Sequence, residues 1–163
     1  MERIGTIVPT SGMSFDRQIM ILRAYVVLSD FGRSPVQYLR VVNTLNIARS
    51  QVSGVNSFFV GLGLLNQVED GLYLPTACTL EFYSQMPGTE DFSKIKRCIE
   101  SSELFQIVRN FILIHGSASE TTILSEVLRA SGTSTNARAR RAIEWLARCE
   151  LIEINDDEVI SIP

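Results

Sequence analysis

The chain has 163 residues and a mass of 18.2 kDa, enough for one domain of medium size or two domains of about 80 residues each. Because 45% of its residues are hydrophobic and 20% are charged, it has the means to bury a core, and wholesale disorder is excluded. Its net charge of -3 excludes a generally basic nucleic-acid coat protein. Of the 15 cationic residues, however, 13 are arginine, and arginines can still form a local basic patch.

Residue patterns exclude several further classes of function. The three cysteines, Cys78, Cys98 and Cys149, are far apart and form no CxxC pair, so we expect reduced thiols and a cytoplasmic protein. The only histidine, His115, is interpreted as the polar end of a helix, which leaves no histidine-based metal site. The sequence contains no phosphate-binding glycine loop and no carboxylate pair or nucleophile–base set at catalytic spacing. We therefore expect no enzyme activity, no cofactor and no metal.

The sequence carries no pattern for export or membrane insertion. Residues 1–13 lack the basic start and the long apolar run of a secretory signal. The most apolar stretch, residues 19–28, is too short to span a bilayer. We therefore expect no membrane partner.

The first half of the chain predicts three helices followed by a hairpin. A stripe of apolar residues from Phe15 to Val26, at spacings of four, three and four, predicts the first helix. The second helix is expected to begin with Ser34 as N-cap and Pro35 as its first residue, and to end at Asn46. Its buried stripe would consist of Val36, Leu39, Val42 and Leu45. A third helix follows from about residue 48, and a hairpin turns at residues 69–71. Short helices are predicted over residues 77–86 and 93–100, the latter bridging to the second half.

The second half repeats this order. Helices are predicted over residues 104–114, from about residue 119 to 131, and from about residue 135, and a hairpin turns at residues 155–158. A shift of 87 residues places Val52 on Ala139 and Leu64 on Leu151. A register that holds from a helix into a strand indicates an internal duplication.

The order helix, helix, turn, helix and two-stranded wing resembles the winged helix-turn-helix superfamily. In the first half the resemblance depends on the turn at residues 45–53 and on the hairpin at residues 63–74. In the second half it depends on residues 133–145 and 149–154. The resemblance implies a mainly α fold with small β wings, an α+β class, arranged as two tandem units. Their expected bounds are residues 14–88 and 89–163, after a tail of residues 1–13.

The resemblance also implies a DNA-binding protein, and a transcriptional regulator is the leading interpretation. In winged-helix DNA-binding proteins the third helix enters the major groove, so polar residues near its start are the candidate contacts. In the second unit these are Asn136, Arg138, Arg140, Arg141 and Arg148, and in the first unit they are Arg49, Ser50, Ser53 and Asn56. The competing interpretation of the arginines is a solvated surface paired with nearby carboxylates such as Glu144.

A second function class remains open, a non-enzymatic adaptor that assembles proteins. Tandem winged helices also occur in subunits of chromosome-organising and endosomal sorting complexes. Both predicted wings are acidic at the tip, at residues 69–70 and 156–158, which would repel phosphates at close range. Acidic wings favour the adaptor interpretation over DNA binding.

Two predicted helices, near residues 19–28 and 104–114, are apolar on nearly all sides. Because a small unit buries only one face of such a helix, the spare face must meet the other unit, a second copy of the chain or a partner protein. We therefore expect the units to be packed together, or dimerised, through these helices. For the tail, both an edge strand beside a wing and disorder remain open.

Overall fold

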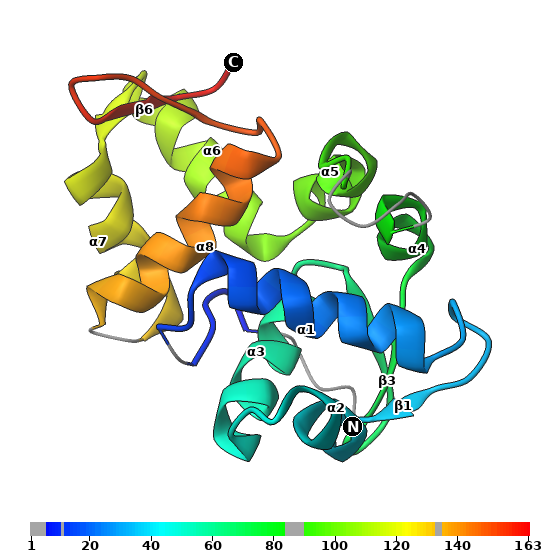
Figure 1. Cartoon of the computed structure of the whole chain (residues 1–163). Coiled ribbons are helices and arrows are strands. Elements are labelled where there is room, and N and C mark those ends of the chain that lie inside the picture. Colours follow the sequence, from blue (N-terminus) through cyan, green and yellow to red (C-terminus); the bar gives the residue numbers. More distant parts are fainter. Residues whose placement is uncertain (1–5, 11, 84–89, 133–134) are drawn as a thin grey trace.

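The computed structural model of the chain describes residues 6–10, 12–83, 90–132 and 135–163 (Figure 1). The first half contains α1 (Phe15–Leu28), β1 (Val36–Gln37), α2 (Tyr38–Leu45), α3 (Arg49–Gly61), β2 (Leu65–Glu69) and β3 (Leu72–Pro75). Helices α4 (Ala77–Tyr83) and α5 (Ser93–Glu100) follow. The second half contains α6 (Glu103–His115), β4 (Ala118–Ser119), α7 (Glu120–Ser131), α8 (Asn136–Arg148), β5 (Glu153–Ile154) and β6 (Val159–Ser161).

The two halves have the same order of elements: a helix, a short strand, two helices and a hairpin. Each half also contains an antiparallel sheet of three strands, with the strand orders β1-β3-β2 and β4-β6-β5. In both sheets the second strand of the hairpin lies in the centre, and the short strand before the second helix pairs with it. The mainly helical α+β class is confirmed.

The second helix begins later than the sequence predicts. Val36 and Gln37 form β1, paired with Tyr73 and Leu72, and α2 begins only at Tyr38. The prediction that Ser34 caps this helix was wrong, because Val36 enters the sheet and is fully buried there. The helix does end as expected, at Asn46, which adopts the left-handed conformation with φ 52° and ψ 47°.

The predicted stripe of this helix is correspondingly incomplete. Leu39 is 36% exposed, whereas Val41, which lay outside the stripe, is fully buried. Beginning the helix two residues later rotates the face that meets α1 and α3, since successive helical residues are about 100° apart.

The bridging segment forms α5 over Ser93–Glu100, the range that the sequence predicts, and α5 packs beside α4. The helix predicted over residues 77–86 forms as α4 over Ala77–Tyr83. The remainder of that range and the linker up to residue 89 lie outside the described residues.

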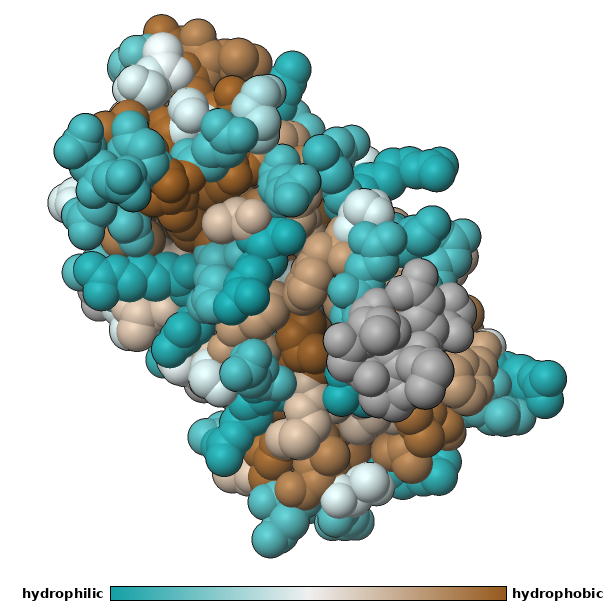
Figure 2. Space-filling model, turned by 45° about the horizontal axis from the view of Figure 1, so that its top comes forward, coloured by the Kyte–Doolittle hydropathy of each residue, from teal (hydrophilic) through white to brown (hydrophobic). Residues whose placement is uncertain are grey.

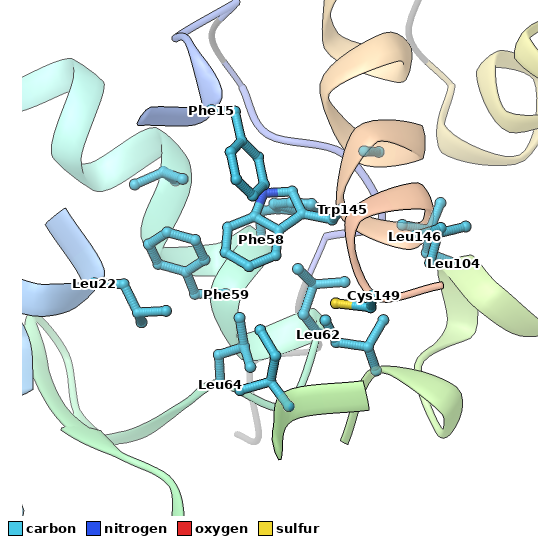
Figure 3. Packing of buried hydrophobic residues seen from close by; sticks show 14 of the residues in the cluster. Phe15, Leu22, Phe58, Phe59, Leu62, Leu64, Leu104, Trp145, Leu146 and Cys149 are labelled. Carbon is cyan, nitrogen blue, oxygen red and sulfur yellow. The ribbon is translucent and has the colours of Figure 1, made fainter. Parts of the chain in front are cut away.

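The two halves share one core, in which α1 packs on α8 (Figures 1 and 3). The ring of Trp145 on α8 lies 4.8 Å from that of Phe15 and 5.8 Å from that of Phe59, between ring centroids. The indole Nε1–H donates to Gln18 Oε1 at 2.7 Å, and Gln18 Nε2 donates to the carbonyl of Met13 at 3.1 Å. Polar groups buried between the halves are thereby hydrogen-bonded, as burial requires.

The expectation that apolar first helices join the units holds for α1 in a modified form. In Figure 1, α1 crosses the middle of the molecule, with α8 on one side and α2 and α3 on the other. Its spare face is therefore covered by the third helix of the other half. Helix α6 is different, because Leu113 and Ile114 near its end are 59% and 77% exposed.

The expectation of reduced cysteines was wrong for two of the three. Cys78 on α4 and Cys98 on α5 form a disulfide with a Cα–Cα distance of 6.8 Å. Their sequence separation of 20 residues gave no indication of the pair, because the pair depends on α4 and α5 lying side by side. Cys149 is a buried free thiol. Among the described residues, no helix is long and apolar enough to cross a membrane.

Replacing Tyr25 with phenylalanine should destabilise the protein. The buried Tyr25 hydroxyl donates to Asn56 Oδ1 at 2.8 Å, so its removal leaves a buried amide without this partner. We expect Tyr25→Phe to lower the free energy of unfolding by about 1–3 kcal/mol in urea titrations. Tyr38→Phe, the same change at a half-exposed ring, is the control and should alter it by less than about 0.5 kcal/mol. Equal effects of the two changes would contradict the importance of the Tyr25–Asn56 hydrogen bond.

The accessibility of the thiols should follow the structure. Burial raises the pKa of the Cys149 thiol to about 12, so at about pH 8 the thiol stays protonated as well as enclosed. A thiol-labelling reagent should therefore modify no cysteine of the native chain, one cysteine after unfolding, and all three after unfolding and reduction. Mass spectrometry of the labelled chain counts them, and three labels without a reductant would contradict the disulfide.

Candidate nucleic-acid interface

Helix α8 carries the densest group of cations in the chain. Thr135 occupies its N-cap position with an extended backbone. One side of the helix is buried and consists of Ala139, Ala142, Ile143, Trp145 and Leu146. Its alanines allow close packing on α7, and its large residues fill the core. The opposite side carries polar residues, so α8 presents a polar surface on a rigid element.

The structure brings all five predicted contacts of the second unit onto this helix, with different exposure. Asn136, Arg140 and Arg148 are exposed, and Arg138 and Arg141 are half-buried. With four arginines and one glutamate, the helix has a net charge of +3 within a chain of net charge -3. A local basic surface therefore exists, as the sequence predicts.

Glu144 neutralises part of this surface. Its carboxylate accepts from Arg141 Nη1 at 3.1 Å and lies 3.8 Å from Arg148 Nη2. The Arg148 guanidinium also lies over the ring of Phe15, 5.0 Å from its centroid. For these two arginines the pairing with Glu144 considered from the sequence is present. Arg138 and Arg140 have no ion pair within the described part of the chain.

The acidic wing tip lies away from the start of α8. The backbone N–H of Glu120, at the start of α7, donates to the carbonyl of Glu158 at 2.7 Å, which ties the tip to that end of α7. Helix α7 has 12 residues and therefore separates its two ends by about 17 Å. Because α8 begins shortly after the far end of α7, the carboxylates of the tip are well separated from Asn136 and Arg140.

Helix α3 presents a smaller polar surface than expected. Arg49, Ser50 and Ser53 are exposed near its start, and the Ser53 hydroxyl donates to the carbonyl of Ser50 at 3.2 Å. Asn56, by contrast, is only 1% exposed and accepts from Tyr25. The prediction that Asn56 lies on the exposed face was wrong, because α1 covers that side of α3 with the Tyr25 ring.

The N-terminal segment covers another part of α3. Thr6 N–H donates to the carbonyl of Ser57 at 3.0 Å, and Thr10 N–H donates to that of Gly54 at 3.2 Å. Gly54 is buried beneath this segment, where the absence of a side chain allows close approach of the two backbones. Neither option considered for the tail describes residues 6–10, which pack along a helix. A glycine in the middle of an amphipathic helix was the signal that this contact exists.

Comparisons with models of protein families, with curated protein sequences and with solved structures found no match. The interpretation of this interface therefore depends on its own geometry.

Removing the Glu144 carboxylate should strengthen the basic surface. Glu144→Gln frees Arg141 and Arg148, and we expect the variant to elute from a heparin column at higher salt than the unchanged protein. Stability should fall by less than about 1 kcal/mol, because the pairs are partly exposed. Glu126→Gln, which frees Arg129 on α7 with the same change of charge, is the matched control. A shift as large for Glu126→Gln as for Glu144→Gln would contradict a localised basic surface on α8.

Proposed function

We propose that the chain consists of two tandem winged-helix units and binds duplex DNA through the start of α8, as a transcriptional regulator does. The repeated order of elements and the matching strand orders support the winged-helix interpretation. The observation that carries the DNA proposal is the pair of arginines, Arg138 and Arg140, that have no carboxylate partner among the described residues.

The arrangement of these side chains fits contacts to DNA. Asn136 and Arg140 are four residues apart and share one face of α8, so both can reach base edges in a major groove. An asparagine amide can bond adenine with two hydrogen bonds, and an arginine can do so with guanine. Arg138 and Arg140 are two residues apart and project on different sides of the helix, which suits phosphates on the two flanking strands.

The first unit would add a minor contact. Arg49, Ser50 and Ser53 supply one charge and two short hydroxyls at the start of α3. Because the N-terminal segment and α1 occupy the adjoining positions on α3, we assign the main binding energy to α8.

Binding to DNA should depend on these arginines and on salt. Fluorescence anisotropy with a duplex of about 20 base pairs, at about 50 and 150 mM salt, measures both effects. Arg138→Ala with Arg140→Ala should weaken binding about 10–100-fold and reduce the log–log salt slope by about 1.8, since each lost phosphate contact contributes about 0.9.

The matched control is Arg33→Ala with Arg129→Ala, which removes two exposed arginines paired with Asp30 and Glu126. This variant has the same net charge as the test variant and should bind DNA almost as well as the unchanged protein. Absence of salt-dependent binding at micromolar protein, or equal losses in both variants, would overturn the proposal.

The exposed apolar end of α6 favours a second candidate function, an adaptor that assembles proteins. Leu113 and Ile114 are large side chains exposed to solvent on a helix whose remainder is well packed. Hydrophobic surface is visible among hydrophilic side chains over the upper part of the molecule in Figure 2. A protein that co-purifies in equal amount without DNA, and is lost when Ile114 is replaced with aspartate, would favour the adaptor over the regulator.

A further inference from the structure

The outer strand of the second sheet borders an open groove. In the order β4-β6-β5, strand β5 lies at the edge, and no described strand pairs with its other side. A groove of about 750 Å³ runs beside it. Its walls come from α5, from the end of α8 and from β5, and they include Lys96, Ala147, Glu150, Ile152, Glu153 and Ile154.

The backbone of β5 is oriented to accept another strand. Glu153 pairs with Ser161 and Ile154 with Ile160, and the Asn155 N–H donates to the carbonyl of Val159 at 3.1 Å. In an antiparallel ladder, alternate residues bond the same neighbour. The N–H and C=O of Ile154, between Glu153 and Asn155, therefore point away from β6, toward the open edge.

The charge of the groove selects the partner. Glu150 and Glu153 are exposed carboxylates without an ion pair in the described part of the chain, and Lys96 is the cation among the lining residues. The tip of the hairpin adds the exposed acids of residues 156–158. A segment rich in lysine or arginine is therefore complementary to this edge, whereas an acidic segment or a nucleic acid is repelled.

The side chain of Ile154 adds an apolar contact on the other face of the strand. It is 41% exposed and shares a face with its fully buried partner Ile160. A strand added to β5 would set its own residues alternately beside Ile154 and beside Glu153. The matching sequence alternates apolar and basic residues.

We propose that the outer edge of β5 docks an extended segment of a partner protein in which basic and apolar residues alternate. The segment adds a fourth strand to the β4-β6-β5 sheet, with backbone hydrogen bonds to Ile154 and ion pairs to Glu150 and Glu153. This surface lies at the end of α8 opposite to Asn136, about 18 Å along a helix of 13 residues, so it leaves the proposed DNA contacts free.

A labelled peptide tests the docking site directly. A fluorescein-labelled peptide of about seven alternating lysine and valine residues is titrated with the full chain at about 150 mM salt, and anisotropy is measured. We expect a Kd of about 10–100 µM. A peptide of alternating glutamate and valine should not bind. The lysine–valine peptide with a central proline should bind at least about 10-fold more weakly, because proline removes a backbone donor.

Charge reversal on the protein provides the matched comparison. Glu153→Lys should weaken binding about 10-fold, whereas Glu69→Lys, the same change on the outer strand β2 of the first sheet, should leave it unchanged. Circular dichroism confirms that both variants fold. No binding up to about 1 mM protein would overturn the proposal. Equal binding of the proline peptide would overturn strand addition, and equal weakening by both variants would show nonspecific attraction and overturn the site.

Discussion

The arrangement of the whole molecule depends on one buried hydrogen bond between its halves. The indole N–H of Trp145 on α8 donates to the Gln18 amide on α1, 127 residues away in the chain, and the same amide holds the carbonyl of Met13. Because all three polar groups are buried, each must find its partner when the halves meet, and a shift of either helix would break the set. This contact orients α8 against α1 and ends the N-terminal segment at a defined place. That segment in turn lies along α3.

The same junction decides which polar residues face solvent. Phe15 packs on Trp145 and lies beneath the Arg148 guanidinium, so the end of α8 is engaged within the molecule. Glu144 pairs with Arg148 and Arg141, which leaves the unpaired cations at the start of the helix. The acids of the last hairpin are held at the start of α7. Opposite charges are thus separated along the second unit, with cations where α8 begins and carboxylates beside β5. That separation lets one acidic protein offer surfaces to two kinds of partner.

The sequence predicted local elements well and long-range contacts poorly. The apolar periodicity of α1, the bounds of α5 and the left-handed end of α2 at Asn46 all follow from interactions within a few residues, and all three are confirmed. The start of α2 was wrong because Val36 pairs with Tyr73 in a sheet assembled from distant residues. On α3, the exposure of Arg49 followed from its position, but Asn56 was misplaced because helical spacing does not reveal a second helix packed on the polar side. On α8 the arginine cluster was evident, whereas its pairing with Glu144 was one of two open alternatives.

By itself, the sequence determined that this chain is mainly helical, that it repeats one order of elements twice, and that its basic residues gather on the third helix of the second half. These properties are local, since periodicity, caps and turns act over a few residues. The tertiary structure alone decided which face of each third helix stays open, that Cys78 bonds to Cys98, and that β5 borders a groove. These features depend on surfaces that meet only when α1, α5 and α8 pack together, and their residues are separated by 20 to 127 positions in the chain.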